Sequence, residues 1–179
     1  MHLHWNSGLD TGVVEIDAQH REIMELINSL KRLSVQRRRA PIMGEGMLAP
    51  LFRDDRATQS RILEAMDEFI DYTRRHFSFE EAVMEHAGHP ATLEHCTSHQ
   101  AFCTHVQDVR EQFAAGEDVL EGFVRLLTNW LPKHIANDEA ELTELVRDSS
   151  LKETASPEIR LSSGNMFEDI LPEPEIRRP

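Results

Sequence analysis

Apolar residues recur at steps of three and four along four stretches of the chain, which is the spacing of helices that bury one face. We expect these helices over residues 16–35, 57–86, 91–115 and 117–146. No stretch alternates convincingly between apolar and polar residues, as a half-buried strand would. Because the connection between the last two helices is very short and contains Gly116, those helices must be antiparallel neighbours. The pattern therefore predicts an all-α fold, an up-down-up-down four-helix bundle.

Three segments lie outside the predicted helices. The residues before the first helix form an N-terminal arm, and residues 40–55, with two prolines and two glycines, form a loop that is long for a bundle. We expect this loop to fold over one end of the bundle or to contact a partner. From about Asp148 onward the chain is rich in Ser, Pro and Glu and loses its periodicity, which is typical of a flexible tail. We therefore expect a bundle domain over residues 1–148 and a flexible tail over residues 149–179.

The charge and hydropathy of the chain exclude several classes of protein. The chain has 19 Lys and Arg residues against 32 Asp and Glu residues, a net charge of −13, whereas a general nucleic-acid binder needs a basic face. No uncharged run approaches the ~20 residues that span a bilayer, and the N-terminus lacks the basic start and apolar stretch of a secretory signal. Cys96 and Cys103 are seven positions apart, too far on one helix for a disulfide with each other. We expect a cytoplasmic protein that binds neither nucleic acid nor membrane.

On the inward face of each predicted helix the apolar residues form a stripe along the axis. Six polar residues occupy positions in these stripes where Leu or Ile would otherwise belong: His20, His76, Glu80, His95, His99 and His134. His76 and Glu80 are four residues apart, as are His95 and His99, so each pair shares one helical face. A single such pair is weak evidence, because exposed helices carry it by chance. All four helices contribute, however, each in phase with its own stripe. Six such groups in a bundle core would destabilise it unless something neutralises them, and a pair of metal ions does so.

The ligand types narrow the choice of metal. Imidazoles with bridging carboxylates suit iron, and no thiolate lies in phase with the histidines, which argues against a structural zinc or iron–sulfur site. More neutral nitrogen also means less negative charge to stabilise high oxidation states of the metal. The donor set therefore favours reversible oxygen binding over oxidative catalysis.

Further motifs surround these histidines along most of the chain. They are Trp5, Leu9, Thr11-Gly12, Ile16-Asp17-Ala18-Gln19-His20, Tyr72, His76-Phe77, Glu80-Glu81, Met84, His89-Pro90, His95, His99, Phe102, Trp130-Leu131 and His134-Ile135. Through them the chain resembles the bacterial hemerythrins, over roughly residues 5–146.

The resemblance implies a non-haem centre of two iron ions, with an oxo or hydroxo bridge, inside a four-helix bundle. It divides the five histidines between the two ions, one holding His95, His99 and His134 and the other His20 and His76. Glu80 and an acidic residue of the fourth helix bridge the ions by analogy. The iron with fewer histidines keeps an open position for dioxygen.

The identity of the second bridging residue is left open by the sequence. The family expects Asp five residues after the fourth-helix histidine, where this chain has Glu139, while Asp138 lies one residue earlier. Four steps along a straight helix rotate by about 400° and five by about 500°, so Asp138 lies nearer the face of His134. Glu139 has the longer side chain, and Leu142 keeps its expected place after the motif. We prefer Glu139 and keep Asp138 as the competitor.

The remaining polar residues receive simpler interpretations. Three histidines fall outside the ligand phase and are interpreted as exposed or capping residues: His86, His89 and His105. Cys96 and Cys103 are interpreted as packing residues, with redox sensing as the weaker alternative. Glu81 is interpreted as a carboxylate that either faces solvent or supports a ligand from behind.

The leading hypothesis is a small protein, not an enzyme, that binds dioxygen at this di-iron centre as a carrier, store or sensor. As a sensor it would pass a change of shape to a signalling partner through residues 40–55 or the tail. One alternative is a di-iron enzyme that handles peroxide or nitric oxide, motivated by the departure at Glu139. Another is iron sensing or storage, in which metal loading itself controls the fold.

Overall fold

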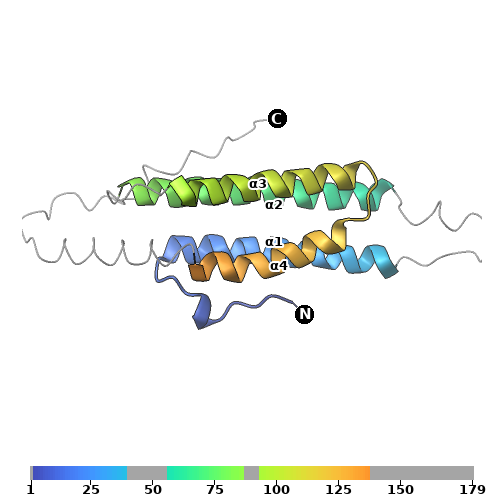
Figure 1. Ribbon diagram of the computed structural model, residues 1–179. Helices are drawn as coiled ribbons and strands as arrows, with labels where there is room; N and C mark the ends of the chain where they lie inside the picture. The colour runs from blue at the N-terminus through green and yellow to red at the C-terminus, as the bar shows by residue number, and fades with distance from the viewer. Residues whose placement is uncertain (1, 40–55, 87–92, 138–179) are drawn as a thin grey trace, which may run out of the picture.

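Four long helices form a bundle in the computed structural model of the chain, which describes residues 2–39, 56–86 and 93–137 (Figure 1). A turn of 3-10 helix, η1 (Ser7–Leu9), precedes α1 (Val14–Arg39), α2 (Arg56–His86), α3 (Leu93–Ala114) and α4 (Leu120–Asn137). Helix α1 packs against α2 and α4, and α3 packs against the same two helices. Consecutive helices run in opposite directions, and no strand occurs in the described ranges. The predicted all-α, up-down-up-down bundle is confirmed.

Several predicted segments lie outside the described residues. They are the loop over residues 40–55, the tail over residues 149–179 and the last turns of the predicted fourth helix. The domain boundary at residue 148 and the partner contacts proposed for the loop and tail therefore stay predictions. None of the helices in the described part of the chain is long and apolar enough to cross a membrane.

The N-terminal arm is fastened to helix α1 at two points. Asn28 of α1 accepts a hydrogen bond from the Leu3 N–H and donates one to the Leu3 carbonyl, both at 3.0 Å. Closer to the helix, the Asp17 carboxylate accepts from the Thr11 N–H at 2.9 Å and from the Thr11 hydroxyl at 2.8 Å. A carboxylate in a first helical turn also interacts favourably with the positive end of the helix dipole. With the arm held in this way, α1 begins at Val14, about two residues before the predicted start.

Helix α4 begins at Leu120, three residues later than predicted. The residues just before it make hydrogen bonds to the last carbonyls of α3 instead. Gly116 has φ = 93°, and its N–H donates to the Phe113 carbonyl at 3.0 Å. The N–H of Glu117 donates to the Gln112 carbonyl, also at 3.0 Å. This pair of bonds is a Schellman motif, which satisfies the last carbonyls of a helix around one left-handed residue. The predicted start at residue 117 is therefore wrong.

The predicted apolar stripes meet in one buried core that takes residues from all four helices. Phe69 of α2 contacts two aromatic rings of α4 edge to face, Phe123 at 6.1 Å and Trp130 at 6.4 Å between centroids. Edge-to-face contacts are a favourable arrangement of aromatic rings. Fully buried aliphatic side chains surround them, among them Ile23, Ile27, Leu30, Ile62, Met66 and Leu127. The interior at the other end of the bundle, near the start of α1, contains the buried histidines and Glu80.

Two glycines near the α3–α4 connection provide substitutions of opposite effect. Gly116→Ala should lower the free energy of unfolding by about 1 to 2 kcal/mol, because alanine is strained at a positive φ. Gly122→Ala, within α4, should raise it by about 0.5 to 1 kcal/mol, because alanine loses less conformational entropy in a helix. A Cβ at either position meets no atom within 4 Å, so crowding does not interfere. Urea unfolding of the two variants measures both effects, and a shift of the same sign in both would contradict the left-handed turn.

Candidate metal centre

The six ligands predicted from the stripes come together at one end of the bundle. The four helices α1 to α4 supply, in turn, His20; His76 and Glu80; His95 and His99; and His134. Five of them are buried, with exposed fractions of 0 to 4%, and His95 is half-buried. Each residue is in phase with the apolar stripe of its own helix, and this phase turns all six toward the interior.

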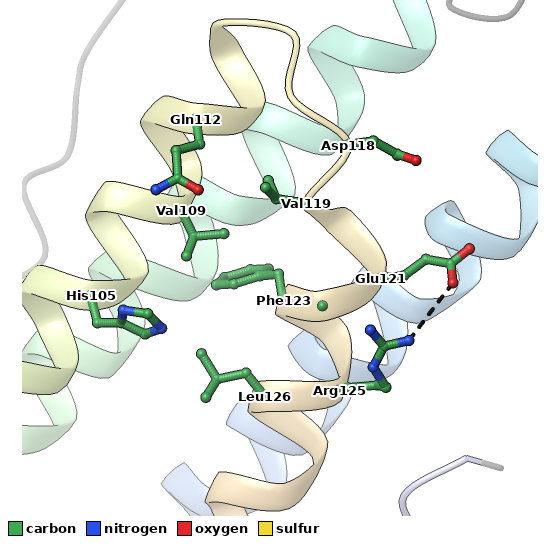
Figure 2. Close-up of a pocket in the computed structure, with 10 residues that line it drawn as sticks. His105, Val109, Gln112, Asp118, Val119, Glu121, Phe123, Arg125 and Leu126 are labelled. Atoms are coloured by element: carbon green, nitrogen blue, oxygen red, sulfur yellow. Dashed lines mark ion pairs between the residues drawn. The ribbon is translucent and has the colours of Figure 1, made fainter.

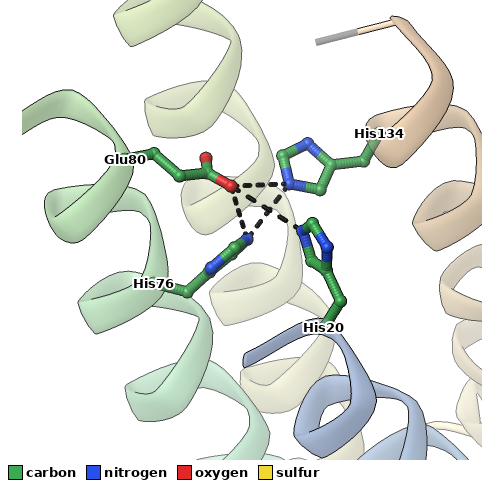
Figure 3. A group of neighbouring side chains, drawn as sticks. All are labelled: His20, His76, Glu80 and His134. Carbon is green, nitrogen blue, oxygen red and sulfur yellow. Dashed lines mark hydrogen bonds and ion pairs between the residues drawn. The ribbon is translucent and has the colours of Figure 1, made fainter. Parts of the chain in front are cut away.

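Three histidines from three helices converge on one oxygen of Glu80 (Figure 3). Measured from Glu80 Oε1, the Nε2 atom of His76 lies at 2.7 Å, that of His134 at 3.4 Å and that of His20 at 3.8 Å. The Nε2 atoms of His76 and His134 are 3.2 Å apart. These four side chains form the first histidine cluster.

The other oxygen of Glu80 faces the histidines of helix α3. His99 Nε2 lies 3.4 Å from Glu80 Oε2, and the rings of His95 and His99 are 4.2 Å apart between centroids. One donor atom from each of Glu80, His95 and His99 lies within 4.8 Å of the other two. These residues form the second histidine cluster, and Glu80 belongs to both.

The spacing of the donor atoms suits metal ligation. Metal–nitrogen and metal–oxygen bonds of about 2.1 Å place neighbouring ligands of an octahedral ion about 3.0 Å apart. The distances from Glu80 Oε1 to its three histidines range from 2.7 to 3.8 Å and include this value. Imidazole and carboxylate together are suitable ligands for iron, and in the described part of the chain neither cluster includes a cysteine. The donor set therefore fits the expected iron site.

The position of His134 differs from the expectation. The resemblance implies that this histidine shares an ion with the two α3 histidines, whereas its donor atom groups with His20 and His76. Its ring centroid nevertheless lies 5.5 Å from that of His76 and 5.7 Å from that of His99, so the ring is almost equally far from one histidine of each cluster. The ion to which His134 belongs stays a prediction.

Asp138 and Glu139, the two alternatives for a second bridging carboxylate, lie outside the described residues. Helix α4 is described as far as Asn137 and continues through Pro132, two residues before its histidine. The choice between the two acids therefore also stays a prediction.

Burial keeps two of the histidines in the form that binds metals. It lowers the pKa of His20 from 6.5 to about 4, against the opposing effect of the Glu80 carboxylate. Burial likewise lowers the pKa of His99, although Glu80 and Glu81 act in the opposite direction. Both imidazoles are neutral at pH 7, and a neutral imidazole offers a nitrogen lone pair to a metal ion.

Two residues hold histidine rings from behind. His76 Nδ1 donates to Gln19 Oε1 at 2.8 Å, and His99 Nδ1 donates to Glu81 Oε1 at 3.0 Å. Because Nδ1 carries the proton in each case, Nε2 is left to face the cluster. Glu81 thus holds the ring of His99, as the second of its two interpretations requires, whereas the contact of Gln19 was not predicted from the sequence. The available signal was weak: each residue is next to a predicted ligand in the chain, but lies 57 or 18 positions from the histidine it contacts.

Aromatic rings cover the clusters on the side of α3 and α4. Phe77 stacks on His99 with the ring centroids 3.7 Å apart and the planes 4° from parallel. Trp130 stacks on His134 at 4.9 Å and 12°, and Phe102 stacks on Trp130 at 4.0 Å between centroids. We call Phe77, Phe102 and Trp130 the aromatic wall. These apolar surfaces restrict the access of water to the histidines and limit the rotation of their rings.

The histidines predicted to lie outside the site include one that the structure describes fully. His105 is exposed and lines a groove between α3 and α4 together with Phe123 and Leu126 (Figure 2). It lies about 9 Å beyond the last α3 ligand along the helix axis, at about 1.5 Å per residue, so the groove is separate from the histidine clusters. The side chains of His86 and His89 lie outside the described residues.

Both cysteines are free and half-buried. Burial raises the pKa of the Cys96 and Cys103 thiols. A raised pKa keeps a thiol protonated at pH 7, and the thiolate is the reactive form. This supports the interpretation of Cys96 and Cys103 as packing residues rather than redox sensors.

The sequence of this chain is similar to those of one family of known proteins. Residues 11–146 match the family model described as the hemerythrin HHE cation binding domain. A bacteriohemerythrin of Pseudomonas aeruginosa is 36% identical over 148 residues, which are 83% of this chain and 84% of that protein. A bacteriohemerythrin of Stenotrophomonas maltophilia is 33% identical over 145 residues, with 81% and 82% covered, and one of Methylococcus capsulatus is 28% identical over 128 residues, with 70% and 81% covered. Since the family match spans all six of the converging histidine and glutamate residues, the chain belongs to the hemerythrin family.

Proposed function

We propose that this chain is a non-haem di-iron protein that binds dioxygen reversibly, as a carrier, store or sensor. The observation that carries the proposal is the buried Glu80 carboxylate, which presents one oxygen to each histidine cluster. A carboxylate in this position can bridge two cations, and the two clusters together provide five imidazoles. Membership of the hemerythrin family supports iron as the metal and dioxygen as the ligand.

In the proposed site, six described residues hold the ions: His20, His76, Glu80, His95, His99 and His134. Glu139 is our preferred second bridging residue, and Asp138 is the alternative. The iron pair, when bound, supplies the electrons and the open coordination position that the uptake of dioxygen requires.

The protein residues favour binding over turnover in two ways. The site holds five imidazoles and few carboxylates, so it carries less negative charge and stabilises high oxidation states of iron less than a carboxylate-rich site does. Gln19 and Glu81 fix the orientation of two ligand rings, and the aromatic wall over His99 and His134 excludes water. In the sensor version of the proposal, a signalling partner contacts residues 40–55 or the tail.

The first prediction concerns the metal content and the spectrum. Chain purified without oxygen should contain about two iron ions per molecule, as bundle cores with two sets of ligands do. Admitting air should produce a charge-transfer absorption band that disappears again under vacuum. Metal analysis and absorption spectroscopy measure the two quantities. A single iron per chain would contradict the di-iron site, and a band that vacuum does not remove would contradict reversible binding.

The second prediction concerns the shared carboxylate. Glu80→Gln should reduce the iron content to about one ion per chain or less, because a neutral amide bridges two cations poorly. The substitution preserves the size of the side chain, so the metal-free variant should stay folded by circular dichroism. Glu85→Gln, at an exposed position of the same helix, is the matched control and should retain both ions. Full iron loading of Glu80→Gln would contradict the bridging role.

The third prediction concerns the residue behind His99. Glu81→Ala should weaken metal binding about 10- to 100-fold, the usual effect of removing the hydrogen-bond partner of a ligating histidine. Competition with a chelator of known affinity measures the change, with Glu85→Ala as the exposed control. Equal affinities in the two variants would show that the bond between Glu81 and His99 contributes nothing to the site.

A further inference from the structure

The hydroxyl of Thr73, in helix α2, is completely buried and makes no hydrogen bond within the described structure. Other helical hydroxyls of this chain behave differently. Thr97, Thr104 and Thr128 each donate to the backbone carbonyl four residues earlier, at 2.6 to 2.9 Å. Ser78, in the same helix as Thr73, does so at 3.0 Å. Thr73 therefore differs from these four hydroxyls, each of which has a backbone acceptor.

An unsatisfied buried donor is unfavourable, because it loses its hydrogen bonds to water and gains none in return. Valine has nearly the shape of threonine and would fill the same space without that cost. A threonine at position 73 is thus well explained if its hydroxyl gains a hydrogen-bond acceptor in the functional state of the protein.

Helix geometry places Thr73 one turn from the first histidine cluster, on the side of the apolar core. It precedes His76 by three residues, so it shares the same face and lies about 4.5 Å away along the axis, at about 1.5 Å per residue. Ile23 follows the α1 ligand by three residues, and Leu131 precedes the α4 ligand by three. Because α1 runs opposite to α2 and α4 (Figure 1), a step of three residues from each of these histidines leads toward the same end of the bundle.

From this placement we infer that Ile23, Thr73 and Leu131 form a floor on the side of the first histidine cluster that faces the apolar core. All three side chains have an exposed fraction of 0%. Two of them are aliphatic and exclude water, and Thr73 alone of the three offers a hydrogen-bond donor. A small ligand that enters between the cluster and this floor would therefore meet one hydroxyl in apolar surroundings, where a hydrogen bond is electrostatically strong.

We propose that Thr73 is a ligand-binding residue, whose Oγ1–H donates a hydrogen bond to a small acceptor, dioxygen or an anion such as azide, held at the metal centre. The inference rests on the proposed function, since it requires the metal ions. It goes beyond the proposed ligand set, because Thr73 contacts the incoming ligand and not the metal.

Azide binding to the iron-loaded full chain tests this inference. Absorption titrations should show that Thr73→Val weakens azide binding about five- to tenfold, the effect of losing one hydrogen bond. Thr73→Ser should restore the affinity to within about twofold, since it keeps the hydroxyl. Thr128→Val is the control, because Thr128 already donates to the Val124 carbonyl, and it should bind azide as the unmodified chain does.

Two further readouts separate a ligand contact from a structural role. Exchange into D2O should shift the infrared stretch of bound azide in the unmodified chain and leave it unchanged in Thr73→Val. The metal-free Thr73→Val chain should melt at the same temperature as the unmodified one or higher, because it loses an unsatisfied donor. A lower melting temperature of the metal-free Thr73→Val chain would show that the hydroxyl has a structural partner, and it would overturn the inference.

The outcomes also separate this inference from the proposed function. If Thr73→Val and the unmodified chain bind azide equally well, the inference fails while the metal centre stands. If the iron-loaded unmodified chain shows no azide-dependent spectrum at all, the proposed function fails, and the role of Thr73 fails with it.

Discussion

The interior of this bundle must accommodate a carboxylate among five imidazoles, and much of the rest of the structure follows from that constraint. Glu80 is 1% exposed, and removing a charge from water costs several kcal/mol unless a counter-charge or hydrogen bonds replace the lost solvation. Its neighbour His20 is a poor counter-charge, since burial lowers the pKa of that imidazole to about 4. Metal cations bound between the two histidine clusters would add positive charge beside this carboxylate and would use the imidazole nitrogens as ligands. Metal binding would then be coupled to the stability of this end of the bundle.

The bundle separates stability from chemistry along its length. Around Phe69 and Phe123 the interior is apolar and closely packed, and apolar burial is the main source of folding free energy. Beyond the floor at Ile23 and Leu131, the same four stripes continue with polar residues. The core fixes the positions of the helices, so the side chains of the two histidine clusters are held in place before any metal ion binds.

Much of this arrangement could be predicted from the sequence because it depends on local periodicity. The stripes predicted four helices and placed His20, His76, Glu80, His99 and His134 in the interior, where the structure has them. The prediction failed where a local motif overrode the apolar pattern. The residues after Gly116 continue no stripe of α3 but complete its C-terminal hydrogen bonds, and α4 starts later as a result.

The sequence by itself determined which residues face inward, because the phase of a side chain on a helix depends only on the number of residues between it and its neighbours. Only the tertiary structure decided which inward residues meet. The bonds from His76 to Gln19 and from His99 to Glu81, and the position of His134 relative to the two clusters, depend on the offsets and rotations of separate helices. Those quantities result from core packing across the whole bundle, and no count of residues along one helix contains them.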